Sequence, residues 1–132
     1  MNPSQPTSPL YPSGIWEGFW EQKHYGRQPM TDFLLRFTSD GEIHGHGIDI
    51  VGRFLITGHY DRHTGQVEWI KQYIGQHPVH YQGLPDGEGS ILGTWRVATA
   101  VAGQVYVDHG AFALRPRLAK PGGNEPIYEL PL

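Results

Sequence analysis

The sequence predicts an all-β fold: a single up-and-down antiparallel meander barrel of about eight strands, with flexible proline-rich termini. Apolar and polar residues alternate with a period of two along almost the whole body. Short turn signals separate the alternating segments, and no segment has a sustained apolar stripe with the helical period of about 3.6 residues. A length of 132 residues is that of one domain with one core.

The alternation places apolar side chains on one face of each segment in turn. In the first segment this face carries Trp16, Gly18 and Trp20, and in the fourth it carries Phe54 and Ile56. Strands are therefore expected within residues 14–22, 31–41, 42–49, 52–65, 66–75, 78–84, 90–97 and 104–116.

Glycine residues mark both the turns that connect these strands and the bends within them. The turn signals are Asp40-Gly41, Thr64-Gly65, Asp86-Gly87 and Ala102-Gly103. Short hairpins make neighbours in sequence neighbours in space, and a meander of this length closes into a barrel because closure removes unpaired strand edges. Inward glycines allow the bending that a small barrel needs, and these are Gly18, Gly58, Gly93 and Gly110.

Composition sets the domain limits and excludes several classes of function. Residues 1–13 are expected to form a flexible arm, 14–115 the barrel and 116–132 a coil tail, in which Ile127, Tyr128 and Leu130 are placed to contact the body. The start of the chain has neither the basic nor the apolar region of a secretory signal, and no apolar run approaches the roughly 18 residues of a membrane span. We expect a cytoplasmic protein that binds no membrane.

With no cysteine, the chain has no disulfide and no thiolate metal site. A net charge of -3 and a pI of about 6.2 give no basic surface for nucleic acid. No motif for a phosphate loop, a dinucleotide or a hydrolase nucleophile is present, and we expect no cofactor. The oligomeric state does not follow from these observations.

Two short motifs on the first strand, "GIW" and "GFW", resemble the G-x-W opening of the calycin barrels, the group of lipocalins, fatty-acid-binding proteins and avidins. The later rhythm of "ITGHYD", "VEWIKQY", "HYQG" and "ILGTW" is similar in style to avidin repeats, over residues 14–115. The chain departs from lipocalins in having no helix signal after the barrel. The resemblance implies a barrel with a mouth and identifies no ligand.

The segment "VEWIKQY" raises a question about Lys71, which shares the apolar face of its strand with Trp69 and Tyr73. A buried ammonium requires a partner, and Asp49 has matching parity on a neighbouring strand. One reading is a polar cluster in a pocket, where Lys71 fixes a ligand group or, with a lowered pKa, acts as a base or an imine-forming amine. The other reading is a structural salt bridge or a lysine at the rim.

The eight histidines include the pair His44 and His46, two residues apart on one strand. If both point inward, they are weak candidates for metal ligands, with Asp49 and either His59 or His80 as further ligands. If Gly45 and its neighbour glycine take the inner face instead, both histidines face solvent. The glutamate that a cupin metal motif requires after the second histidine is absent.

Aromatic residues fill much of the expected interior. All four tryptophans fall on inward faces, and an eight-stranded barrel leaves room for side chains or one small ligand. A small pocket is therefore expected rather than a large cavity. The candidate ligand-binding residues are Trp20, Asp49, Tyr60, Trp69, Lys71, Tyr73, Tyr81 and Trp95.

Three functions follow from this reading. The first is a binding protein for a small apolar or aromatic ligand, with Lys71 orienting its polar end. The second is a small enzyme in which Lys71, Asp49 and a tyrosine perform acid–base chemistry, with His80 as a further candidate; no residue is assigned as catalytic. The third is a protein-interaction module that uses the outer surface, including Arg53, His59 and His77.

Overall fold

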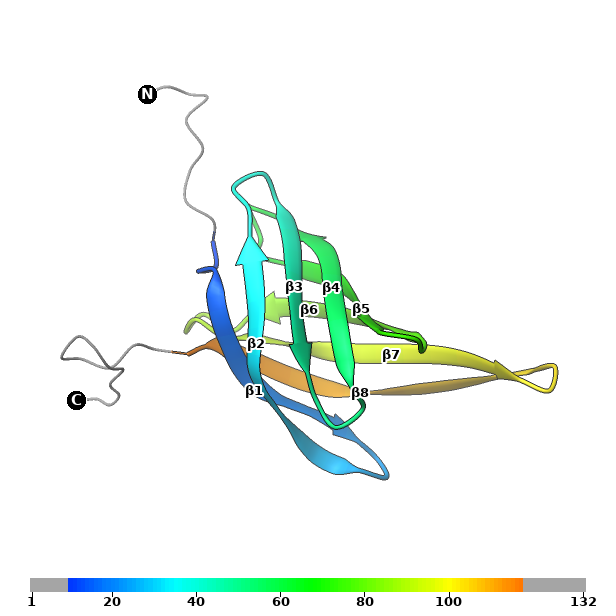
Figure 1. Ribbon diagram of the computed structural model, residues 1–132. Helices are drawn as coiled ribbons and strands as arrows, with labels where there is room; N and C mark the ends of the chain where they lie inside the picture. The colour runs from blue at the N-terminus through cyan, green and yellow to red at the C-terminus, as the bar shows by residue number, and fades with distance from the viewer. Residues whose placement is uncertain (1–9, 118–132) are drawn as a thin grey trace, which may run out of the picture.

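The computed structural model describes residues 10–117 and confirms the all-β prediction (Figure 1). Residues 1–9 and 118–132 lie outside the described residues, as do the expected tail contacts of Ile127, Tyr128 and Leu130. Within the described part, no helix is long and apolar enough to cross a bilayer. The strands are β1 (Gly14–Gln22), β2 (Gly26–Phe37), β3 (Glu42–Ile48), β4 (Arg53–Tyr60), β5 (Val67–Tyr73), β6 (Pro78–Pro85), β7 (Ile91–Val101) and β8 (Gln104–Pro116).

The eight strands form a closed barrel in which each strand is antiparallel to the next. Closure comes from β1 and β8, which pair from Trp16 opposite Pro116 to Trp20 opposite Phe112. This is the up-and-down architecture that the calycin resemblance implies. At one end lie the turns β1–β2, β3–β4, β5–β6 and β7–β8; we call this the open end (Figure 1).

Glycine is required where neighbouring strands come too close for a side chain. A Cβ atom on Gly18 would lie 1.9 Å from the carbonyl oxygen of Ala113, and one on Gly93 would lie 1.9 Å from that of Gln82. In both cases the obstacle is backbone, which cannot rotate away. These inward glycines therefore let the sheet curl tightly enough to close.

Alternation buries one face of every strand, and the interior is filled. The pattern is clearest in β5, where every second residue from Val67 to Tyr73 is buried. All four tryptophans are at most 6% exposed. Barrel volume that a larger ligand would need is thus occupied by aromatic side chains.

The end opposite the open end is closed by Tyr11, which precedes β1 and is 5% exposed. Its hydroxyl donates a hydrogen bond to the carbonyl of Gly65. Its ring contacts Trp16, Phe37 and Tyr60, with the centroid of Phe37 at 5.0 Å. Burial raises the pKa of Tyr11 to about 12. The packed core thus includes a residue from the segment that the sequence assigns to the flexible arm.

Candidate functional site

Lys71 forms a fully buried ion pair near the open end of the barrel. Its Nζ lies 2.8 Å from Oδ2 of Asp49, and the two side chains are 0% and 1% exposed. Lys71 projects inward because β5 alternates, and it lies between Trp69 and Tyr73 on the buried face. Both charges therefore lie in the interior, as the alternation of side chains along the strands predicts.

Asp49 reaches the interior from the β3–β4 turn. Asp49 and Gly52 exchange two backbone hydrogen bonds of 3.1 Å, which close the turn. Oδ1 of Asp49 accepts from the backbone nitrogen of Val51 at 2.9 Å, so the carboxylate also caps this turn. One oxygen thus fixes the loop while the other binds the ammonium.

Two tyrosines complete the hydrogen bonding of the pair. Tyr73 donates its hydroxyl proton to Oδ2 of Asp49 at 2.6 Å, and the Lys71 ammonium donates to the Tyr81 hydroxyl at 3.3 Å. The ring of Phe54 covers the ammonium, 4.3 Å from its centroid. Burial lowers the pKa of Lys71 in spite of the Asp49 carboxylate, and burial raises the pKa of Tyr73 and Tyr81.

Above this network lies a hollow of about 280 Å³ at the open end. Three turns and the start of the projecting part of β7 contribute to its wall. Its lining residues are Trp20, Gln22, Tyr25, Val51, Tyr73, Gln76, His77, Val79, Tyr81, Trp95, Val97 and Asp108. Tyr73 and Tyr81 therefore belong both to the hollow and to the buried ion-pair network.

The wall of the hollow is largely aromatic. The ring of Trp20 stands edge-to-face against Trp95 at 5.9 Å and against Tyr25 at 6.1 Å. The Trp95 indole nitrogen donates to the carbonyl of Glu21 at 2.9 Å. The buried indole N–H of Trp20, by contrast, has no acceptor in the described part of the chain. Because this nitrogen is itself buried, it is not offered to the open space of the hollow.

One acidic side chain is placed at the rim. Gln22 donates from Nε2 to Oδ2 of Asp108 at 2.7 Å, while its own Oε1 accepts from the backbone nitrogens of His24 and Tyr25. These bonds join the β1–β2 turn to β8 and hold the Asp108 carboxylate in position. The residues that line the hollow include this carboxylate but neither lysine nor arginine. An electropositive ligand group is therefore favoured there.

The structure divides the candidate residues into three groups. Trp20, Tyr73, Tyr81 and Trp95 line the hollow. Lys71, Asp49 and Trp69 lie in the packed interior and are absent from its lining, Trp69 being stacked on Tyr81 at 5.5 Å. Tyr60 lies at the far end, where its hydroxyl donates to the carbonyl of Thr38.

Sequence reasoning did not name Asp108, although this residue lies on β8 with the parity of Gly110 and Phe112, and it placed His77 on the outer surface, whereas both residues line the hollow. It also missed the loop residues Tyr25 and Val51. Strand parity cannot place a loop side chain, so only proximity to a predicted turn could have indicated them.

For His44 and His46, the structure shows the alternative in which glycine takes the inner face of the strand and the histidines face outward. Gly45 pairs with the buried Leu35 while both histidines lie on the outer face, and His44 contacts Glu42 at 3.0 Å. Among residues 10–117, no three potential ligands gather around a metal position.

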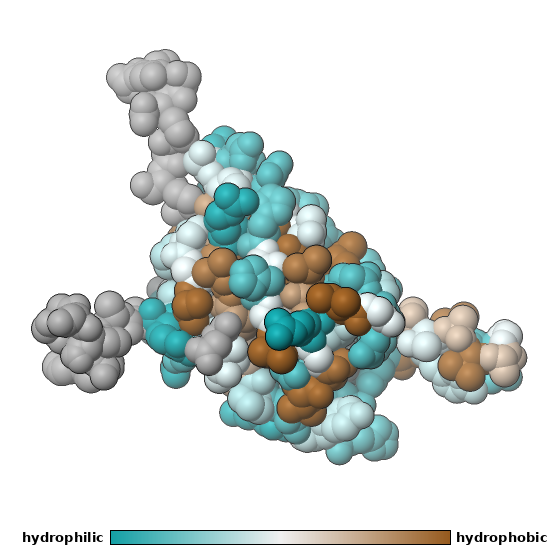
Figure 2. Space-filling model, viewed as in Figure 1, coloured by the Kyte–Doolittle hydropathy of each residue, from teal (hydrophilic) through white to brown (hydrophobic). Residues whose placement is uncertain are grey.

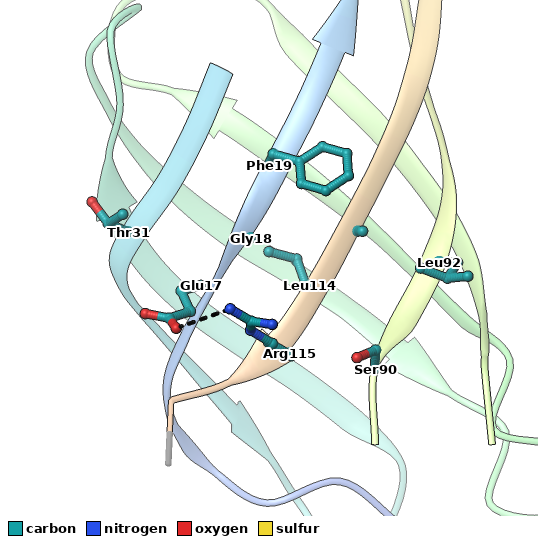
Figure 3. Close-up of a pocket in the computed structure, with 9 residues that line it drawn as sticks. Glu17, Gly18, Phe19, Thr31, Ser90, Leu92, Leu114 and Arg115 are labelled. Carbon is teal, nitrogen blue, oxygen red and sulfur yellow. Dashed lines mark ion pairs between the residues drawn. The ribbon is translucent and has the colours of Figure 1, made fainter. Parts of the chain in front are cut away.

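A second hollow, of about 300 Å³, lies on the outside of the barrel (Figure 3). It forms over the backbone of Gly18, between Phe19 and Leu92. Glu17 and Arg115 pair across its floor at 3.8 Å. This carboxylate also accepts from Arg117, so it is already occupied by two arginines, which makes the open-end hollow the stronger candidate.

Comparisons of the chain with protein-family models, with curated proteins and with solved structures find no match.

Proposed function

We propose that this protein binds a small aromatic or apolar molecule in the hollow at the open end of the barrel. The observation that carries the proposal is the aromatic wall formed by Trp20, Tyr25, Tyr73, Tyr81 and Trp95 around about 280 Å³. A dry cavity of about 150 Å³ accommodates benzene, so this volume suits one substituted ring or a small bicycle. The resemblance to calycin barrels also supports a binding site at the open end, because it implies a barrel with a mouth there.

The polar groups favour a ligand with a cationic end. Aromatic faces attract ammonium groups, and several rings around one hollow strengthen that attraction. Asp108 supplies the carboxylate at the rim, while the Lys71 ammonium is already neutralised by Asp49. The expected role of Lys71 in orienting a ligand therefore passes to Asp108.

The placement of Lys71 favours binding over acid–base catalysis. A general base must reach its substrate directly or through one water molecule. Lys71 and Asp49 are absent from the lining, and their polar atoms are held by Tyr73, Tyr81 and the β3–β4 turn. In this arrangement the pair stabilises the pocket floor.

Tryptophan fluorescence tests the proposal, because Trp20 and Trp95 line the hollow. Three probes of similar size separate the ligand classes: benzyltrimethylammonium, benzyl alcohol and phenylacetate. We expect a saturable change with the ammonium at the lowest concentration and none with the anion. The absence of a saturable change with all three would refute the proposal, and equal binding of all three would refute the cationic preference.

Matched variants then locate the site. Tyr25→Ala and Asp108→Asn change the hollow, whereas Tyr106→Ala and Glu68→Gln change exposed residues outside its lining. We expect the first two to weaken ammonium binding about threefold to tenfold, the range of one cation–π or ionic contact. The second two should leave it unchanged. Equal effects in both sets would show that the ligand binds elsewhere.

A further inference from the structure

A third hollow, of about 440 Å³, lies on the outer face of the barrel over β6, β7 and β8. Its lining includes the polar residues Glu68, His80, Gln82, Thr94, Arg96 and His109. All six are exposed, because they alternate along their strands with residues that face the interior. This hollow is therefore separate from the aromatic one at the open end, although Trp95 contributes to both.

Three basic side chains lie next to one another in this hollow. Arg96 on β7 is paired with His80 on β6 and with His109 on β8. Directly opposite residues have Cβ atoms about 5 Å apart, so a histidine stands on each side of the arginine. We call these three residues the basic row. His80 therefore faces solvent and not Lys71, in contrast to its expected role in acid–base chemistry.

The basic row has no acidic partner in the described part of the chain. No hydrogen bond or ion pair joins its three side chains to another residue within 10–117. Other outer-face histidines differ in this respect, since His44 contacts Glu42 at 3.0 Å and His59 contacts Glu68 at 3.4 Å. Like charges directly opposite each other are unfavourable across strands. An anion bound over the row would turn this repulsion into attraction.

The carboxylate among the lining residues is directed elsewhere. Glu68 on β5 accepts from Gln82 at 3.3 Å and contacts His59 at 3.4 Å. It lies opposite Gln82, two strands and two residues from Arg96, which corresponds to about 12 Å between Cα atoms. This distance exceeds the screening length of about 8 Å at physiological salt. Glu68 therefore neither neutralises the row nor strongly repels an anion there.

The other elements around the row add no free carboxylate. Between Arg96 and Asp108, β7 and β8 continue as a projecting arm that contains no charged residue (Figure 1). The visible atoms of this arm are mostly brown and pale (Figure 2). Asp108 itself lines the open-end hollow, and Glu21 on β1 is paired with Arg27 at 2.7 Å. The positive charge is thus concentrated at the base of the arm.

Uncharged donors continue the site beside the basic row. Gln82 and Thr94 are opposite each other, one outward position along from His80 and Arg96. A guanidinium donates two parallel hydrogen bonds to a tetrahedral oxyanion, and amide and hydroxyl groups donate to further oxygen atoms. A hollow of about 440 Å³ is within the size range of small-molecule sites, about 300–1,000 Å³. It therefore has room for an oxyanion and a polar substituent.

We propose that the basic row binds a phosphate group, as the free ion or as part of a small phosphate ester. Arg96 holds two of its oxygen atoms, and His80 and His109 donate to it from either side once they are protonated. The polar substituent of an ester contacts Gln82 and Thr94. Imidazole changes its charge between about pH 5 and 8, so binding tightens as the pH falls through that range. The proposal is independent of the ligand proposed for the open end.

Nuclear magnetic resonance titration tests the site, because side-chain N–H and imidazole signals report on each residue separately. Sulfate is the first probe, since it is a tetrahedral dianion whose charge is constant in this pH range. We expect saturable shifts at Arg96, His80 and His109, with binding about tenfold tighter at about pH 5.5 than at about pH 8, the effect of two surface ionic contacts. No saturable shift at tens of millimolar sulfate, or equal affinity at both pH values, would overturn the proposal.

Two further probes distinguish the sources of the phosphate group. Inorganic phosphate and glycerol phosphate should both shift the signals of the basic row and compete with sulfate. Tighter binding of glycerol phosphate assigns an ester, and tighter binding of inorganic phosphate assigns the free ion. Failure of both to displace sulfate would contradict the assignment to a phosphate group.

Matched variants show which residues hold the anion. Arg96→Gln should weaken sulfate binding about tenfold or more. Arg36→Gln is the control, since it removes another exposed outer-face arginine that is opposite a histidine, His44, and it should leave binding unchanged. The double variant His80→Gln with His109→Gln should remove the pH dependence. Equal losses in the two arginine variants, or a pH dependence that survives the double variant, would refute the role of the basic row.

Discussion

Replacing Lys71 with methionine tests whether the buried ion pair holds the open end together. The substitution keeps the length and volume of the side chain and removes only the ammonium. It leaves the Asp49 carboxylate 1% exposed with Tyr73 and the turn nitrogens as its remaining donors. Breaking one side of a buried pair costs about 3–5 kcal/mol. At about 4 °C per kcal/mol, the melting temperature should fall by about 12–20 °C.

A double-mutant cycle separates the pair from its surroundings. In Asp49→Asn, the amide keeps an oxygen for the β3–β4 turn but sets an NH₂ group against the ammonium. We expect the double variant, which carries no buried charge, to be more stable than Lys71→Met by about 2–3 kcal/mol. Urea unfolding followed by tryptophan fluorescence measures all four free energies.

The exposed Lys23→Met serves as the control and should change stability by less than about 0.5 kcal/mol. Equal costs for Lys23→Met and Lys71→Met, or a coupling energy of zero, would refute the reasoning.

Three further predictions concern pH, the closed end and the glycines. Burial raises the pKa of Tyr60, Tyr73 and Tyr81, so the folded state keeps protons that the unfolded chain releases, and their contribution to stability should be constant below about pH 10 and fall above it. Burial lowers the pKa of Lys71 from its ordinary 10.5, so its own effect lies below that value, where stability should rise as the pH climbs through the folded-state pKa. Unfolding free energies measured by urea across alkaline pH, with near-ultraviolet absorbance counting phenolates, check this; a flat profile contradicts it. Tyr11→Phe should cost about 1 kcal/mol for the lost hydrogen bond and Tyr11→Ala about 3–5 kcal/mol for the cavity, and thermal unfolding that ranks the two equally would argue against Tyr11 as a packed core residue. Gly93→Ala should cost about 3 kcal/mol or more, because its Cβ would meet the Gln82 carbonyl. The adjacent exposed Thr94→Ala should cost under about 1 kcal/mol, and equal urea midpoints for the two variants would contradict the prediction.

Strand parity predicted the interior because it depends only on the period of two. The positions of Phe54, Ile56 and Lys71 follow from that period once each segment is recognised as a strand. Tyr11 and Tyr25 could not be placed in this way. One lies before the first strand and the other in a turn, where backbone direction depends on contacts distant in sequence.

The Lys71–Asp49 pair shows where a sequence argument correctly locates residues and leaves their role open. Matching parity brings the two charges together, and both readings of Lys71, as ligand group or structural pair, predict the same juxtaposition. What separates them is the space beside Nζ, which depends on how Phe54, Tyr73 and Tyr81 pack around it. These rings enclose the ammonium, so the free polar groups of the open end are those nearer the surface.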